Sequence, residues 1–319
     1  MIPVMSNHNS FQLRPLRDSD IPEYADLLYN SFNVWYHQKG WGQDYFGCTP
    51  AETAIFYDIY NDLTSGCSIA TFDNRSGRMM GACFYHPREH HVSLGIMSVH
   101  PDYWERRAGR AMVDHILDFT RSNNYRSCRL VGSAMNMNSF SLYNRAGFVP
   151  RVVYQDMVLR VPDTGLSGEH ILDGKYVRDA VEDDVQAMGE LEMEVSGIRR
   201  LKDYRYSINN PRGILHASVY ANDRQAIDGF MISVRHPALN MVGPCVARTE
   251  ETALALISRE LERFRGSWVL LLVPMEKRKI IQQMYAWGAR NVETHLKQVW
   301  GEFQPFNGVS MPSFLPETG

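Results

Sequence analysis

The sequence predicts a mixed α/β protein built from two halves of similar architecture. In each half, consecutive strand-like segments come first and then alternate with helices, which implies a mixed, mostly antiparallel sheet flanked by helices. The same order of elements occurs twice in 319 residues, as expected of an internal duplication. Between the halves, residues 162–170 are polar, rich in glycine and without hydrophobic periodicity, which is typical of a linker.

The first half begins with a short strand and turn over residues 11–20, and a helix follows, with apolar residues near helical spacing. Gly95, inside the third long strand, predicts a β-bulge. The remaining expected elements are an aromatic loop at 33–47, a helix near 50–63, hairpin strands at 67–73 and 79–87, a strand at 90–99, a loop and helix, a strand at 126–134, a short helix at 138–147 and a final strand at 148–161.

The second half repeats this order after the linker. The sequence therefore predicts a first domain over 1–161, a linker over 162–170 and a second domain with a C-terminal tail over 171–319. The expected elements of the second domain are a strand and an acidic helix start at 174–184, hairpin strands at 214–222 and 225–237, a strand at 240–248, a helix at 249–264, a strand at 267–274, a helix at 276–288 and a strand at 292–300.

Composition excludes several classes of function. With a net charge of −3, the chain has no general attraction for nucleic acid or for an anionic membrane. Its five scattered cysteines form no C-x-x-C pair, so we expect no disulfide framework and no metal. Its start lacks a basic segment followed by an apolar run, so we expect no signal peptide and a cytoplasmic location. Its last five residues, LPETG, match a sortase motif, which we interpret as chance or a remnant of expression.

A basic loop joins the strand at 90–99 to the following helix. It carries Arg106, Arg107 and Arg110, and Gly109 and Ala111 complete the pattern R-x-x-G-x-A. A helix start has unpaired N–H groups and a partial positive charge, so arginines there are unfavourable unless an anion binds. Successive backbone N–H groups can hold a diphosphate, and Gly109 would let the backbone approach it closely. The alternative interpretation is a helix start with its arginines in water.

A second segment makes the pattern more specific. Its sequence fits N-x-x-[AS]-x-x-x-Y-x-x-x-G-F at Asn136, Ser139, Tyr143, Gly147 and Phe148. Together with the basic loop and a V-x-P sequence before it, in the same order and spacing, this segment resembles the GNAT superfamily of acyl-CoA-dependent N-acyltransferases. The resemblance covers about residues 11–160. It implies a GNAT fold, and it implies that the anion is the pyrophosphate of acetyl-CoA.

The resemblance also implies roles for individual residues. Pantetheine would enter between two splayed parallel strands, at 93–99 and 127–133, where a backbone N–H would stabilise the developing oxyanion. Tyr143 would protonate the leaving thiolate as general acid, and simple packing on the sheet is its alternative role. Asn136 would contact pantetheine or, alternatively, cap a helix. The residues expected to bind acetyl-CoA are Met97, Ser98, Val99, Arg106, Arg107, Ala108, Gly109, Arg110, Ala111 and Asn136.

The acceptor pocket and the general base are less well defined. An aromatic segment with few charges is expected to line the acceptor pocket, which argues against a polycationic acceptor; a second core cluster is the alternative. Its candidate acceptor-binding residues are Trp35, Tyr36, Trp41 and Tyr45. An amine must lose a proton before it attacks, and the sequence offers several candidate bases without a choice among them: Glu89, His90, His91 and His86.

The second half has the order of elements without the chemistry. No basic glycine loop precedes the helix at 249–264, and Glu250 and Glu251 occupy its start, where they would repel a phosphate. We therefore expect a degenerate GNAT-like domain and one acetyl-CoA per chain. The second sheet or the tail at 301–314 could wall off the acceptor pocket or support a homodimer.

The predicted function is transfer of an acetyl group from acetyl-CoA to a primary amine of a small-molecule or amino-acid-like acceptor, without a metal. The sequence leaves two alternatives open. One is an N-acyltransferase that uses a different acyl donor or acts on a peptide or protein N-terminus. The other is a non-catalytic sensor or interaction module that binds CoA.

Overall fold

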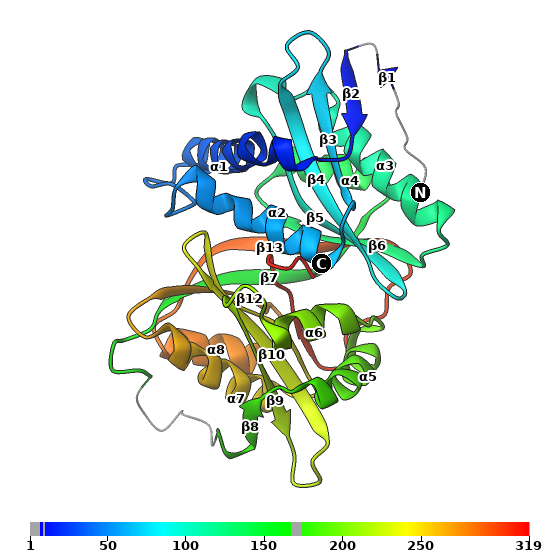
Figure 1. The fold of residues 1–319 in the computed structure, drawn as a ribbon. Coiled ribbons are helices and arrows are strands. Elements are labelled where there is room, and N and C mark those ends of the chain that lie inside the picture. Colours follow the sequence, from blue (N-terminus) through cyan, green and yellow to red (C-terminus); the bar gives the residue numbers. More distant parts are fainter. Residues whose placement is uncertain (1–6, 9, 167–173, 319) are drawn as a thin grey trace.

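The structure is a computed structural model that describes residues 7–8, 10–166 and 174–318. The predicted mixed α/β class is confirmed (Figure 1). The first half contains β1 (Asn7–His8), β2 (Phe11–Arg14), α1 (Ile21–Gln38), α2 (Ile55–Leu63), β3 (Ser68–Asp73), β4 (Met79–Pro87), β5 (His91–Val99), α3 (Ala108–Ser122), β6 (Ser127–Ser133), α4 (Met137–Arg145) and β7 (Val149–Arg160).

The second half repeats this arrangement and adds a short strand near the C-terminus. Its elements are β8 (Val177–Asp179), α5 (Val185–Ser196), α6 (Leu201–Asn209), β9 (Leu215–Ala221), β10 (Ile227–His236), β11 (Leu239–Ala247), α7 (Glu250–Leu261), β12 (Trp268–Pro274), α8 (Arg278–Ala286), β13 (Arg290–Gly301) and β14 (Val309–Met311). Part of the predicted linker, residues 167–170, lies outside the described residues.

The two halves exchange their last long strands. β7 of the first half pairs with β12 of the second half on one side and with β13 on the other, and β13 also pairs with β6. The two sheets are therefore joined in the order β1-β2-β3-β4-β5-β6-β13-β7-β12-β11-β10-β9-β8. In Figure 1, β7 and β13 lie across the middle of the molecule. A boundary near residue 161 divides the sequence, but each sheet is completed by a strand from the other half.

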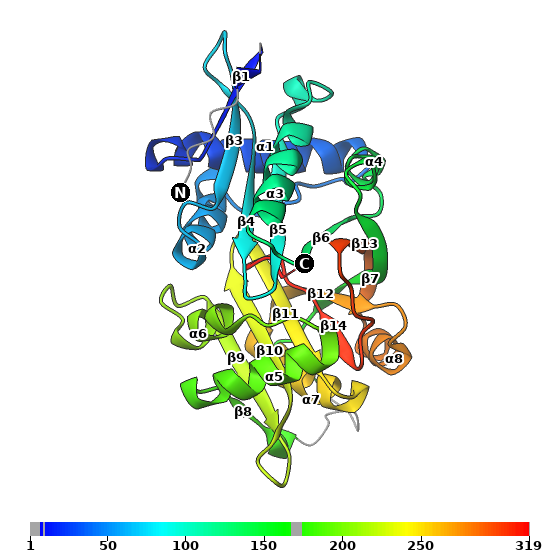
Figure 2. The ribbon, with the colours of Figure 1, turned by 90° about the vertical axis from the view of Figure 1, so that its right-hand side faces the viewer.

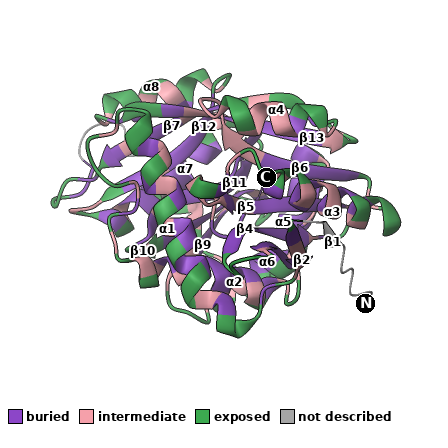
Figure 3. Cartoon of the chain, turned by 90° about the horizontal axis from the view of Figure 1, so that it is seen from above, coloured by how far each residue is buried: buried purple, intermediate pink, exposed green. Residues whose placement is uncertain are grey.

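The helices cover the joined sheet on both faces and create three main cores. α3 and α4 pack over the first half, and α7 and α8 pack over the second half. On the opposite face, residues of α1, α2, α5 and α6 contribute to one core that both halves share. Figure 3 shows buried strands surrounded by helices with exposed outer surfaces, and Figure 2 shows the two sets of helices from the side. The shared core fixes the two halves against each other.

Three local expectations differ from the structure. The predicted aromatic loop begins too early, because α1 continues to Gln38 and so carries Trp35 and Tyr36 on its last turns. The helix α6 and the strand β14 were not expected. The interpretation of the terminal LPETG as chance or a remnant of expression is corrected in one respect: residues 315–318 are buried, so this segment is part of the core.

Candidate active site

A gap between two parallel strands forms the centre of the candidate site. β5 and β6 pair only from His91 to Ser93 on β5, and beyond this point they diverge. The register between β4 and β5 slips between Cys83 and Tyr85 of β4, opposite three residue steps of β5. This slip confirms the bulge predicted at Gly95. The bulge bends β5 where the gap opens.

A cavity of about 920 Å³ passes through this gap. On one side it is lined by Met97, Leu130 and Tyr143, which belong to the core under α3 and α4. On the other side it is lined by Ile96 and Val131, which pack against the core shared by both halves. The cavity therefore connects the two faces of the sheet, so two ligands could approach each other from opposite sides.

The start of α3 forms one end of the cavity. Its N-cap residue, Arg107, has a left-handed backbone with φ of 66°, and no side chain caps the helix. The first turn of α3 carries no acidic residue. The helix therefore presents N–H groups without a competing side-chain acceptor, which is the local environment that an anion requires.

Most of the residues predicted to bind acetyl-CoA lie around this cavity. Those that line it are Met97, Ser98, Val99, Arg107, Ala108, Gly109, Arg110 and Asn136. Arg106 and Ala111 do not line it; the Arg106 guanidinium lies 5.4 Å from the ring centre of Tyr103. Glu105 as well as Arg107 has a left-handed backbone in this loop.

Two of these residues also form hydrogen bonds within the protein. The Val99 carbonyl accepts a hydrogen bond of 2.9 Å from the indole N–H of Trp104. The Asn136 side-chain oxygen accepts a bond of 3.0 Å from the Ser139 N–H and so caps α4. The capping alternative for Asn136 is therefore correct, and the residue also lines the cavity.

Tyr143 lies on α4 and faces the gap from the side of α3. It lines the cavity and is 7% exposed. Burial raises the pKa of its phenol, and nearby thiols and the Glu317 carboxylate add to the effect. A phenol is protonated at neutral pH even without this shift, and the raised pKa makes it a weaker acid. Its ring also packs on Phe148 with centres 5.9 Å apart, so the residue has a packing role as well.

The predicted aromatic wall is present at the other end of the cavity. Trp35, Tyr36 and Tyr45 line it, whereas Trp41 packs behind them with its ring centre 4.5 Å from that of Tyr36. The rings of Tyr36 and Tyr45 stack with centres 4.4 Å apart. Tyr36 is buried. The segment thus forms both a core cluster and a cavity wall, which the sequence treated as alternatives.

The equivalent gap in the second half is filled by the chain itself. The β10–β11 register slips between Met231 and Ser233, and this bulge matches the one between β4 and β5. The match aligns Cys245, Val246 and Ala247 with Met97, Ser98 and Val99. β14 pairs with just those three residues of β11. The strand therefore occupies the edge that remains open in the first half.

The start of α7 also lacks the features that make the start of α3 suitable for an anion. Thr249 caps α7 by accepting a hydrogen bond of 3.1 Å from the Thr252 N–H, and Glu250 and Glu251 lie in the first turn. The Glu250 carboxylate also accepts hydrogen bonds from backbone N–H groups at the start of α8. The Thr249 side chain therefore satisfies an N–H group that an anion would otherwise bind, and the two glutamates would repel an anion.

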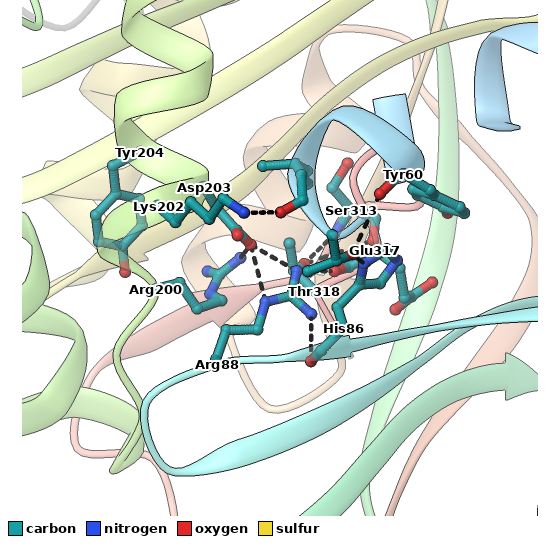
Figure 4. A network of polar contacts seen from close by, with 12 residues as sticks. Tyr60, His86, Arg88, Arg200, Lys202, Asp203, Tyr204, Ser313, Glu317 and Thr318 are labelled. Carbon is teal, nitrogen blue, oxygen red and sulfur yellow. Dashed lines mark hydrogen bonds and ion pairs between the residues drawn. The ribbon is translucent and has the colours of Figure 1, made fainter. Parts of the chain in front are cut away.

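The segment after β14 reaches the first half and lines part of the cavity. Phe314 and Glu317 line the cavity. The Tyr60 hydroxyl of α2 donates to the Phe314 carbonyl. Arg88 donates to the Glu317 carbonyl at 2.9 Å and also binds Asp203 of α6 (Figure 4). The tail is therefore bound by side chains of the first half, and the preceding strand β14 pairs with β11 of the second half.

None of the four candidate bases from the sequence lines the cavity. His86 and His91 are fully buried, and burial lowers the pKa of each below its ordinary value. The Glu89 carboxylate accepts a bond of 3.3 Å from the Leu201 N–H on the far side of the strand end. His90 lies next to it at the start of β5. The structure therefore gives no geometric support to any of these four candidates, among which the sequence made no choice.

A different polar cluster lies at the aromatic end of the cavity, on the exchanged strands. It consists of Asp156 on β7 and Glu293 and His295 on β13, and His295 lines the cavity. His295 Nδ1 lies 2.9 Å from Asp156 Oδ1. Tyr36 donates to Glu293 at 2.7 Å, and Ser133 donates to the other oxygen of Glu293. No sequence motif marked these residues, because the pairing of β7 with β13 brings them together.

The same three residues are close enough to share a metal ion, since their donor atoms lie within 4.8 Å of one another. Each carboxylate already accepts hydrogen bonds from protein groups, however. We therefore describe Asp156, Glu293 and His295 as a hydrogen-bonded cluster.

Among the described helices, none combines the length and the apolar character needed to cross a membrane.

Two family models match the chain. The model described as the acetyltransferase (GNAT) family matches residues 28–148, and the model described as the acetyltransferase (GNAT) domain matches residues 188–303. The chain belongs to the GNAT family. It carries two GNAT domains in tandem, and such domains are those of N-acyltransferases. A search of curated proteins found no match.

Solved structures support the same GNAT fold over the whole chain. A protein of Pyrococcus horikoshii, provisionally named an acetyltransferase, has a TM-score of 0.75 and 13% identity, with 97% of each chain covered. A GCN5-related N-acetyltransferase from Sphaerobacter thermophilus has a TM-score of 0.60 and 16% identity, with 93% of this chain and 97% of that chain covered. A tandem GNAT protein from the clavulanic acid biosynthesis pathway has a TM-score of 0.60 and 15% identity, with 91% and 98% covered. These likenesses concern the fold alone.

Proposed function

We propose that this protein transfers an acetyl group from acetyl-CoA to a primary amine of a small molecule, at a single site in the first half. The observation that carries this proposal is the cavity that joins the uncapped start of α3, the open edge of β5 and the aromatic wall. One end suits a diphosphate and the other end suits an organic acceptor. The gap between β5 and β6 is where the two would meet.

The residues present fit acetyl-CoA on structural grounds. Met97, Ser98 and Val99 pair with β4 on one edge, and no strand pairs with their other edge among the described residues. Acetyl-CoA would supply the acyl group as a thioester. The backbone of this segment would orient the pantetheine, and the N–H groups of α3 would hold the diphosphate. Tyr143 would donate its phenolic proton to the thiolate that leaves.

The second half would contribute walls and support instead of a second donor site. β14 already hydrogen-bonds the equivalent segment of β11, and α7 begins with a capping threonine and two glutamates. Titration of acetyl-CoA into the full chain by calorimetry should therefore give a stoichiometry near one. Two equivalent sites would contradict this assignment.

The activity itself is tested by thiol release from acetyl-CoA against a panel of primary amines, with mass spectrometry of the products. We expect acetylation of one or more small amines. Acetylation restricted to peptide or protein N-termini would favour the peptide alternative. Acetyl-CoA binding without acetylation of any amine or peptide would instead favour a non-catalytic CoA-binding module.

A further inference from the structure

We propose that His295 is the general base of the reaction and that Asp156 positions it, so that the second half supplies a catalytic residue to the site in the first half. This inference rests on the proposed function and deepens it, since it also indicates an acceptor that arrives as an ammonium ion. Its basis is the place of the exchanged strand β13, which carries His295 into the cavity.

The position of His295 fits an acceptor-side base. On the joined sheet it lies directly opposite Ser133 of β6, which also lines the cavity beyond the gap. Its ring packs on Phe314, with ring centres 5.2 Å apart, and Phe314 belongs to the shared core. Tyr143 lies with the core of the opposite face. Acid and base would therefore act from the two sides of the sheet.

The hydrogen bonds of His295 define which nitrogen could accept a proton. Nδ1 lies 2.9 Å from the Asp156 carboxylate, so the neutral ring carries its proton on Nδ1 and donates it to Asp156. Among the described residues, Nε2 has no hydrogen-bond partner. It is also not one of their fully buried side-chain atoms that lack a partner. Nε2 is therefore the basic atom, and the cavity is its accessible side.

Several charged groups from different elements act on this imidazole. Burial alone lowers its pKa, but the Asp156 carboxylate of β7, Glu293 of β13 and Glu317 of the tail outweigh burial and raise the pKa above its ordinary value. Tyr36 of α1 and Ser133 of β6 bind Glu293. Lys297, two residues along β13, is buried, and its burial lowers its own pKa to about 7.

The lining of the cavity also indicates the chemical class of the acceptor. The acceptor end combines one carboxylate, Glu317, with aromatic rings from α1, the following loop and Phe314, whereas Asp156 and Glu293 do not line the cavity. A primary ammonium group on an apolar body satisfies both features, because the Glu317 carboxylate attracts its charge and the rings contact its carbon atoms. Lys39 at the cavity edge would disfavour an acceptor with many positive charges.

In the proposed reaction, the ammonium group gives up two of its three protons in turn. His295 Nε2 takes one proton from the ammonium, and the nitrogen lone pair then forms a bond to the acetyl carbon. The C–S bond breaks with its electron pair on sulfur, which takes the proton of Tyr143. The amide nitrogen loses its second proton to the tyrosinate, and His295 releases its proton to solvent. The net products are the amide, the free thiol and one proton.

The first test compares His295→Gln with His216→Gln. His216 is a matched control, since its Nδ1 lies 2.8 Å from the buried Glu260 carboxylate but the residue does not line the cavity. With the best amine of the panel, we expect kcat to fall about 10²-fold or more for His295→Gln, with acetyl-CoA affinity within twofold. We expect little change for His216→Gln. Near-normal kcat in a folded His295→Gln protein would overturn the assignment.

The second test uses Asp156→Asn, which is nearly isosteric and separates a positioning role from a structural one. In the wild type, activity needs the neutral base, so kcat should fall as the pH drops through the raised pKa of His295. Removing the Asp156 charge should lower this pKa, so the acid limb should move to lower pH while its plateau decreases. NMR titration of the His295 imidazole, with no substrate present, should show the same shift.

The outcomes distinguish failure of the His295–Asp156 pair from failure of the proposed acetylation. An unchanged acid limb and an unchanged imidazole titration in Asp156→Asn would overturn the His295–Asp156 pair while leaving amine acetylation by the wild type in place. A wild type that acetylates no amine would overturn the proposed function and this inference with it. Loss of activity on chelation, with recovery on adding a divalent metal, would assign the cluster to metal binding and also overturn the proposed base.

Discussion

The two gaps between parallel strands, at β5–β6 and at β11–β12, begin in the same way and end differently. Each lies beside a strand with a bulge, and each is followed by a helix. In the first half the gap opens into a cavity. In the second half β14 pairs along the equivalent edge. One fold can therefore present a ligand site or fill it with its own chain, so the fold alone does not assign a function to each half.

The largest expected effect concerns the helix start that distinguishes the two gaps. Gly109→Glu places a negative side chain near the diphosphate position and should weaken acetyl-CoA binding at least about 100-fold. Gly109→Ala is the matched control, because an added Cβ would lie 3.4 Å from a Leu142 methyl group, an ordinary contact. Calorimetry on both folded variants measures the difference. Tight binding by Gly109→Glu would remove this helix start from the donor site.

The second prediction compares the tyrosines of α4 and α8. Tyr143→Phe removes the buried phenolic proton and should lower kcat about 100-fold, with acetyl-CoA affinity nearly unchanged. Tyr285 of α8 is 48% exposed and donates to Gln155 at 3.2 Å, so Tyr285→Phe should change kcat less than about twofold. Steady-state kinetics with the best amine decides. Equal effects of the two substitutions would return Tyr143 to a packing role.

The third prediction concerns the strand that fills the second gap. Met311 of β14 is 1% exposed in the core under α7, so Met311→Ala should lower the free energy of unfolding by about 2 kcal/mol. Met97→Ala, at the open gap, should cost less because that side chain is only partly buried. Denaturant titration measures both. An equal or larger loss for Met97→Ala would contradict this comparison.

The smallest expected effect concerns the exposed arginines. Arg107→Ala should weaken acetyl-CoA binding about fivefold to tenfold at low salt, and less at high salt, because an exposed cation on a phosphate is screened. Arg248 before α7 forms ion pairs with Glu194 and Asp228, so Arg248→Ala should leave binding unchanged. Calorimetry at two salt concentrations tests both. A salt-independent loss for Arg107→Ala would indicate a structural role instead.

The sequence by itself determined the local features of this protein. Hydrophobic patterns and turn residues predicted most strands and helices, and Gly95 predicted the bulge of β5. The sequence places arginines at the start of one helix, α3, and glutamates at the start of another, α7. Because the partial positive charge of a helix start acts on groups within about one turn, these residues predicted an anion site at α3 and none at α7. The Asn136 to Phe148 pattern indicated the family, since its spacing depends only on one helix and its end.

Only the tertiary structure decided which strands meet. No local pattern specifies that β13 pairs with β6, or that β14 returns to β11, because strand pairing depends on partners far apart in the chain. The cluster around His295 and the position of the tail follow from these pairings. The sequence therefore predicted the cavity residues between Met97 and Arg110, which come from one continuous segment. At the other end of the cavity it predicted the aromatic residues of one segment, but it did not predict Phe314, Glu317 and His295, because these come from the other half.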